Sequence, residues 1–279
     1  MHGSKCHGGA DSSELHHRIT NSQNRSVQLA SFLTDYLQDP AARVGPIASG
    51  IFEFLLGVQK FVYKLRIHLL SRLLGQGLDS DDPCLFTDEE RNSVRIVNNV
   101  VYSAKQFTVN YTTYDVRRDC DTVNIATHPH VMLRSPEADT NAHPFWYAQV
   151  LGVYHANVST THPAAQKHSA QRMEFLWVRW LGAEPGYHSG SKVAHLPKVG
   201  FVEETDDDAF GFLDPDLVIR GAHLIPNFNL GRTSKLMSYD GVTVARPPGE
   251  KDDWMNFYVN MCVAPRFKCF PSSHSAQFC

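Results

Sequence analysis

The 279-residue sequence lacks the cysteine patterns that mark several common protein classes. Its six cysteines stand far apart, at positions 6, 84, 120, 262, 269 and 279, and no CxxC pair occurs. Zinc ribbons and zinc fingers need closely spaced ligand pairs, so this spacing excludes them. Unclustered cysteines in a chain of this length are typical of reduced thiols and predict an intracellular protein.

Long apolar runs are also missing. No segment approaches the roughly 20 apolar residues that a membrane-spanning helix needs. The first residues lack the basic-then-apolar order of a secretory signal. We therefore expect an intracellular location and no membrane partner. The formal net charge of −3 argues against a protein whose whole surface coats nucleic acid, although a local basic patch is compatible with it.

The motifs of nucleophilic and nucleotide-dependent catalysis are absent as well. The chain contains no GxSxG elbow, no GxxxxGK[ST] phosphate loop and no GxGxxG turn. The sequence thus gives no assembled catalytic site and no small-molecule cofactor, and it favours a non-catalytic protein.

The chain does contain one long segment with the apolar spacing of a helix, and many short apolar segments typical of strands follow it. Apolar residues recur at three- and four-residue spacing over residues 46–74, with Pro46 suited to a first turn and Gly75 to a stop. From residue 94 onward, β-branched and aromatic residues dominate between Pro, Gly and Asn. Without helical periods between them, such strands favour an antiparallel sheet or a small SH3-like barrel. The predicted class is α+β, mainly β, with a long N-terminal helix before the β region.

Composition divides the chain into segments. Thr87 and Glu90 match a capping box, which predicts a short helix beginning at Asp88. The expected segments are a polar, disordered arm over 1–45, a helical part with an acidic linker over 46–92, a β-rich domain over 94–261 and an atypical tail over 262–279.

The segment MEFLWVRW, residues 173–180, places an arginine between two tryptophans. Strand alternation sends Trp177 and Trp180 to opposite faces, so they cannot form one stacking shelf. Arg179 shares a face with Trp177, and we expect its stem to pack while its guanidinium reaches an edge or an acid. We interpret the segment as the central strand. The expected structural core includes Trp146, Phe175, Trp177 and Trp180.

Two segments carry residues that a metal-dependent hydrolase or nuclease could use. YDVRRDCD holds Asp115 and Asp119, and THPHV holds His128 and His130 at a spacing that puts both rings on one side of an extended strand. Acids interleaved with arginines favour salt bridges instead, and Pro129 between the histidines favours a loop. The βα alternation that supplies further ligands in such enzymes is absent, so metal chemistry is the alternative interpretation.

Cations near the Trp-rich strand are candidates for contact with phosphates. Lys192 and Lys198 follow that strand, and Arg220 and Arg232 lie further along the chain. Together they predict a modest positive rim on a small barrel. The acidic run at residues 203–208 would repel DNA phosphates locally, and we interpret it as a solvated loop.

Several segments, in this order, resemble a known family: NYTTYDVRRDCDTVN, HPFWYAQVLGVYHANV, MEFLWVRW, FGFLDPDLVIRGAHLIPNF, GRTS and DWMNFYVNM. They are similar to the C-terminal region of Plavaka-type, CACTA-like transposase proteins of mushroom-forming fungi. The likeness runs from about Phe52 to Met261 and covers most of the chain.

This resemblance implies a non-catalytic role. In that family, transposase activity is attributed to an RNase H-like acidic core on the N-terminal side of this region, and no such core fits before residue 46 here. We therefore expect a transposon-derived C-terminal part that contacts DNA, chromatin or a transposase subunit, in the nucleus. The ending CVAPRFKCFPSSHSAQFC departs from the family pattern, which leaves Cys262, Cys269 and Cys279 without an expected role. A non-functional remnant of a transposable element is the further alternative.

Overall fold

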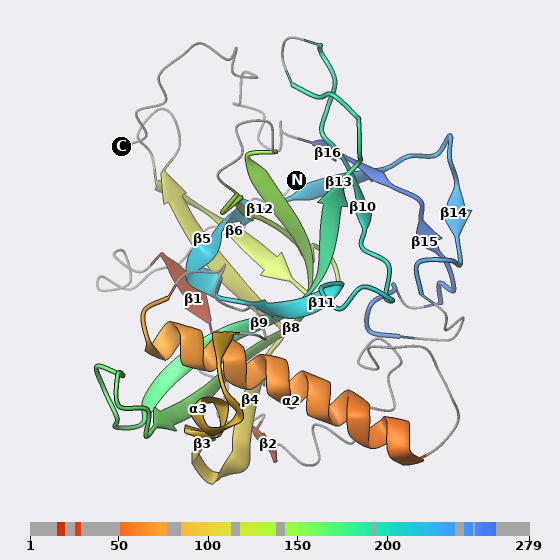
Figure 1. Ribbon diagram of the computed structural model, residues 1–279. Helices are drawn as coiled ribbons and strands as arrows, with labels where there is room; N and C mark the ends of the chain where they lie inside the picture. The colour runs from red at the N-terminus through yellow and green to blue at the C-terminus, as the bar shows by residue number, and fades with distance from the viewer. Residues whose placement is uncertain are drawn as a thin grey trace.

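The computed structural model describes residues 16–19, 26–28, 51–76, 85–112, 118–137, 143–190, 193–237, 243–247 and 249–260. Within these ranges the chain is mainly β, and its strands form antiparallel sheets (Figure 1). The expected tail over 262–279 lies outside the described residues.

The apolar-periodic segment forms α2 (Ile51–Leu73), a 23-residue helix. Phe61, Leu65 and Leu69 are buried along it at four-residue spacing. The helix ends at Gly75, whose φ of 72° lies in the left-handed region that glycine adopts without strain. Among the described residues, no helix has the length and apolar content needed to cross a membrane.

The expected capping box is confirmed. The backbone N–H of Glu90 donates to the Thr87 hydroxyl at 3.3 Å, and the Glu90 carboxylate accepts from the Thr87 backbone at 2.7 Å. The short helix α3 (Asp88–Asn92) begins there, because the backbone N–H groups of Thr87 and Glu90, which have no partner within the helix, gain side-chain acceptors.

Most of the strands build one 11-stranded sheet around a long antiparallel hairpin, β8 (Phe145–Thr160) and β9 (Gln171–Ala183). Residues 161–170 connect the two strands. The other members are β2 (Ser26–Gln28), β3 (Val94–Ile96), β4 (Val100–Ala104), β7 (His130–Arg134), β10 (Lys198–Phe201), β11 (Phe210–Leu213), β12 (Val218–Gly221), β13 (His223–Pro226) and β16 (Phe257–Asn260).

The main path of this sheet runs β12-β7-β8-β9-β10-β16-β13, and it does not close into the expected barrel. The strands at its two ends, β12 and β13, follow each other along the chain and are separated only by Ala222. The backbone N–H of Ala222 donates to the carbonyl of His130 at 2.8 Å. The continuous segment 218–226 therefore supplies both end strands of the sheet (Figure 1). In the described chain, β12 and β13 do not pair with each other.

Two smaller sheets complete the described fold. The first has the order β1-β5-β6, from β1 (His17–Ile19), β5 (Gln106–Thr112) and β6 (Arg118–Asn124). The second pairs β14 (Arg232–Thr233) with β15 (Asp253–Trp254).

Strands β1 and β2 come from the arm that we expected to be disordered, so that expectation is wrong for these residues. β1 pairs with β5, and β2 pairs with β4. The edges of β5 and β4 offer unpaired backbone groups that a short extended segment satisfies, even when the segment is polar. Ile19 anchors β1, since only 6% of its surface is exposed.

Cys120 in β6 is disulfide-bonded, which corrects the expectation of reduced thiols for this residue. The other cysteines lie outside the described residues. Spacing along the chain could not show the bond, because folding brings distant positions together.

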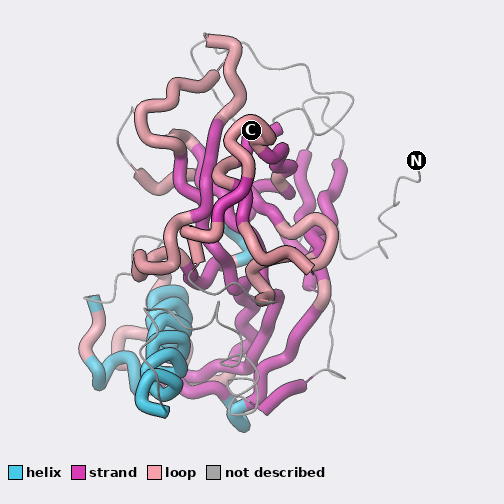
Figure 2. The backbone as a smooth tube through the Cα atoms, turned by 90° about the vertical axis from the view of Figure 1, so that its right-hand side faces the viewer, coloured by secondary structure: helices cyan, strands magenta, loops and turns pink. Residues whose placement is uncertain are grey.

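The β8–β9 hairpin is covered on both faces. On one face, the Phe61 ring of α2 meets Trp177 and Phe212 edge-on, with centroids 6.2 and 5.0 Å apart. Figure 2 shows α2 lying alongside the strands. On the other face, Leu176 of β9 belongs to a buried cluster with Phe107 of β5. The hairpin is thus the central layer of the described fold.

The tryptophans fall on opposite faces, as expected. Trp177 belongs to the cluster under α2, whereas Trp180 packs against the cluster that includes β5. The core expectation is confirmed for Phe175 and Trp177, which are 1% and 3% exposed. Trp146 and Trp180 are only half-buried, because they lie at the margin of their cluster.

Arg179, between the tryptophans, is completely buried and donates to both oxygens of Asp253, at 2.8 and 3.2 Å. Arg246 donates to the same carboxylate at 3.1 and 3.3 Å. The expected contact with an acid is confirmed. The guanidinium is buried and lies 3.9 Å from the ring centroid of Phe201. Burial lowers the pKa of Arg179 and outweighs the opposing effect of Asp253.

The Arg179 site is not fully satisfied. Its Nε–H and the side-chain carbonyl of Gln149, its cross-strand neighbour, find no hydrogen-bond partner in the described part of the chain. Arg179 therefore carries a desolvation cost that partly offsets its bonds to Asp253.

The network predicts an asymmetry between its members. We expect Asp253→Asn to lower the free energy of unfolding by about 3–5 kcal/mol, because two buried guanidinium groups lose their anion. Arg179→Met should cost less, since Arg246 still pairs with Asp253 and an unsatisfied donor disappears. Urea unfolding at neutral pH measures both losses, and a larger loss for Arg179→Met would contradict this account.

Candidate functional site

The acidic segment YDVRRDCD is held by a partner from elsewhere in the chain. Asp121 accepts from Nε of Arg220 at 3.0 Å and from the backbone N–H of Gly221 at 3.1 Å. The salt-bridge interpretation holds for Asp121, but the arginine comes from β12. Asp119 is exposed in β6, and Asp115 lies outside the described residues.

The two histidines of THPHV occupy different environments. His128 is exposed and lies in the turn before β7, whereas His130 is the first residue of β7. The loop expectation is therefore wrong for His130, because β7 pairs with strands on both sides. Burial lowers the pKa of His130 to about 4, and the nearby His223 and His128 add to this effect. No group of three or more His, Cys, Asp or Glu residues in the described ranges is arranged to hold a metal.

Each described member of the candidate positive rim is paired with a carboxylate. Lys192 lies outside the described residues. An exposed or half-exposed cation whose charge is matched in this way attracts phosphate weakly. The pairs are Lys198–Glu184 at 3.8 Å, Arg220–Asp121 at 3.0 Å and Arg232–Glu250.

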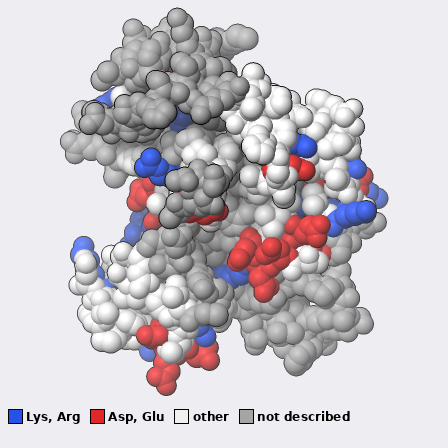
Figure 3. Space-filling model, turned by 45° about the horizontal axis from the view of Figure 1, so that its top comes forward, with Lys and Arg blue, Asp and Glu red and all other residues white. Residues whose placement is uncertain are grey.

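The acidic side chains of the loop between β10 and β11 are exposed, as expected, except that of Glu204, which is buried. Figure 3 shows a group of acidic side chains on the face that is turned toward the viewer. The exposed carboxylates of the loop make this part of the surface attractive to cations. They belong to Glu203, Asp206, Asp207 and Asp208.

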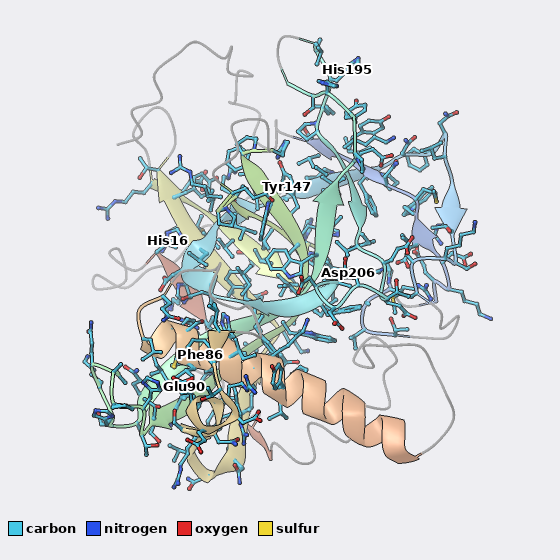
Figure 4. The ribbon with its side chains drawn as sticks, in the orientation of Figure 1. His16, Phe86, Glu90, Tyr147, His195 and Asp206 are labelled. Atoms are coloured by element: carbon cyan, nitrogen blue, oxygen red, sulfur yellow. The ribbon has the colours of Figure 1, made fainter. Side chains whose placement is uncertain are left out.

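A cleft of about 690 Å³ adjoins this loop, where β8 begins and β9 ends. Figure 4 shows Tyr147 and Asp206, two of its lining residues, on the strand-rich part of the molecule and away from Phe86 and Glu90. Its walls combine aromatic rings with carboxylates. The rings are Phe145, Trp146, Tyr147, Trp180, Phe210 and Phe212, and the carboxylates are Glu137, Asp206 and Asp208.

Two half-buried tryptophans form a corner of the cleft. The ring centroids of Trp146 and Trp180 lie 5.7 Å apart, with an angle of 75° between the ring planes. The indole N–H of Trp146 donates to Glu137 at 3.1 Å. Gly211 lies under the other ring, since a Cβ at this position would approach Nε1 of Trp180 to 2.9 Å. Glycine at position 211 therefore makes room for the indole.

A β-bulge puts the two tryptophans on the same face. The register between β8 and β9 shifts between Val150 and Gly152. Without this shift, counting from the hairpin connection would place Trp146 on the face opposite Trp180. The alternation of the sequence therefore could not reveal the pair, and the bulge has no clear sequence signal apart from Gly152 itself.

A second polar cluster lies where β1 docks. His17 bonds Glu174 through Nε2 and Asp216 through Nδ1, each at 2.7 Å. Burial lowers the pKa of His17, but the hydrogen bonds and charges of the two carboxylates outweigh it, so the net pKa is raised. Both ring nitrogens are engaged, so the imidazole links two elements and leaves no nitrogen for a metal.

Comparison of the chain with protein-family models, curated proteins and solved structures gives no match. The resemblance to Plavaka-type transposase proteins therefore remains a prediction from the sequence.

The His17 link predicts a pH-dependent stability. Because its folded-state pKa is raised, its contribution is complete below the ordinary histidine pKa and is lost as the pH rises through the raised value. We expect His17→Gln to cost about 1–2 kcal/mol near pH ~5.5 and clearly less near pH ~8.5.

Urea unfolding across this pH range measures the effect. The exposed His188 supplies a matched control, His188→Gln, which should show no such trend. A cost of His17→Gln that does not change with pH would show that the link works without its proton.

Proposed function

We propose that this chain is a non-catalytic binding domain whose partner is a positively charged protein segment, as chromatin proteins or a basic transposase subunit would present. The observation that carries the proposal is the distribution of charge. The described candidate cations are paired with the chain's own carboxylates, whereas the carboxylates of the 203–208 loop are exposed beside an aromatic cleft.

This distribution favours a protein over DNA among the expected partners. Exposed carboxylates steer a cationic segment toward the loop and repel a phosphate backbone. The resemblance to transposase proteins supplies the setting, in which a chromatin protein or a transposase subunit would be at hand. A transposon-derived domain in the nucleus would meet both kinds of partner.

The alternative of a metal-dependent hydrolase or nuclease gains no support from the described residues. Asp119 and His128 are exposed on separate elements, and the titratable neighbours that act on His130 are two other histidines, His223 and His128. The remnant alternative predicts that no binding is retained, so a binding experiment tests it together with the proposal.

We expect the full chain to bind a fluorescent Lys/Arg-rich peptide at micromolar concentration, measured by fluorescence anisotropy. Binding should weaken as salt rises from ~50 to ~300 mM, because screening reduces the attraction of exposed charges. Duplex and single-stranded DNA of similar size should show no salt-sensitive binding at the same protein concentration.

Two single neutralisations make the experiment specific. Asp206→Asn in the loop should weaken peptide binding several-fold, whereas Glu89→Gln on the exposed surface of α3 removes the same charge and should not. Salt-sensitive DNA binding tighter than peptide binding would overturn the choice of a protein partner. Binding of neither ligand would remove the proposal and favour the remnant alternative.

A further inference from the structure

We propose that the cleft at Trp146 and Trp180 binds the side chain of a methylated lysine. The inference rests on the proposed function and names the ligand chemistry of the same surface. It is carried by three features of the cleft: the aromatic corner, the means by which that corner is held, and the charge of the walls.

The aromatic corner suits a cation. A cation positioned over the face of an indole is attracted by its ring quadrupole, and tryptophan gives the strongest such contact among side chains. Trp146 and Trp180 meet at 75°, so part of each ring borders one common corner. Both side chains are half-buried, which leaves ring surface open to a ligand. The arrangement offers two aromatic walls to a single ammonium group.

The corner is held in place before any ligand arrives. The bulge between Val150 and Gly152 determines on which face of the sheet Trp146 lies. The indole N–H of Trp146 donates to Glu137 at 3.1 Å, which restrains the ring. Gly211 provides the close approach that lets Trp180 lie against β11. Preorganised rings bind without paying for side-chain ordering, which favours a specific ligand over incidental contact.

The walls of the cleft are negative. Three carboxylates line it, from Glu137, Asp206 and Asp208, against one lysine, Lys64. The Lys64 ammonium lies 4.0 Å from Asp208 and donates to the carbonyl of Phe210 at 3.1 Å, so it is already engaged within the protein. Asp208 is 91% exposed. Taking three negative charges and one positive charge leaves an excess of two negative charges for an entering cation.

Methylation decides which cation fits. An unmodified lysine ammonium is strongly hydrated and needs hydrogen-bond acceptors when it leaves water. Methyl groups remove these donors, lower the cost of dehydration and bring carbon atoms against the indole rings, while the positive charge remains. A cleft of about 690 Å³ is ample for one such side chain.

A nucleic-acid base fits less well. Bases stack on parallel aromatic platforms, whereas these rings stand nearly perpendicular to each other. The flanking phosphates would also meet the carboxylates of the same cleft.

The test compares two basic peptides that differ only in one lysine, unmodified or trimethylated, by calorimetry with the full chain. We expect the trimethylated peptide to bind about 10-fold more tightly, as cation–π contacts of this kind allow. Trp146→Ala should remove that difference, and Trp146→Phe should keep part of it. Phe228→Ala is the matched control, because Phe228 is an aromatic side chain that is 72% exposed outside the cleft.

A second variant protects the test against misfolding of Trp146→Ala. Asp206→Asn with Asp208→Asn changes only exposed loop side chains, and the asparagine at 206 can still accept the backbone N–H of Asp208. This variant should weaken binding of the trimethylated peptide by about 10-fold.

Tetramethylammonium alone probes the corner without a peptide. Its binding is followed by tryptophan fluorescence, and the fluorescence change should be lost in Trp146→Ala.

The outcomes separate this inference from the proposed function. Equal binding of both peptides, unaffected by Trp146→Ala, would overturn the inference and leave the proposed function standing. Binding of tetramethylammonium but of neither peptide would overturn the assignment to a lysine on a protein. Failure of every ligand would overturn both.

Discussion

The described fold depends on one buried contact, the carboxylate of Asp253 between the guanidinium groups of Arg179 and Arg246. It joins the central strand β9 to a segment 74 positions further along the chain. Arg179 also lies under the ring of Phe201 and near that of Phe210, the two residues that border the acidic loop. The loop is thus anchored at both ends over a buried cation. Because Phe210 lines the cleft, the same contact fixes one wall of the candidate site.

The sequence allowed the main features of the fold to be predicted where local physics decides them. Four-residue apolar spacing indicated the helix that contains Phe61 and Leu65, and the pair Thr87 and Glu90 marked the start of α3. Alternation in MEFLWVRW separated the tryptophans between two faces. β1 and β2 were not predicted, because their stability comes from partner strands that are distant in sequence. Whether the sheet closes into a barrel likewise depends on how its end strands meet, which no local pattern reveals.

The site was less predictable than the fold, for a physical reason. A lysine or arginine looks available in a sequence until its partner is known, and Arg220 meets Asp121 across 99 positions. Electrostatic function depends on the residual charge after such pairing, so composition alone overstated the positive rim. The aromatic corner was missed for a geometric reason. One extra residue in β8 moves every earlier side chain of that strand to the opposite face of the sheet. Pairing and register, more than residue type, determine what this surface attracts.

The order of strands also has a consequence for synthesis. β16 is the last strand of the described chain to emerge from the ribosome, yet it lies inside the sheet between β10 and β13. Until residues 257–260 are made, β10 and β13 each present an unpaired edge, which is a template for association with another chain. The nascent protein is therefore open to association at these two edges until its final described strand is added. A chain that stopped short of β16 would keep that vulnerability permanently.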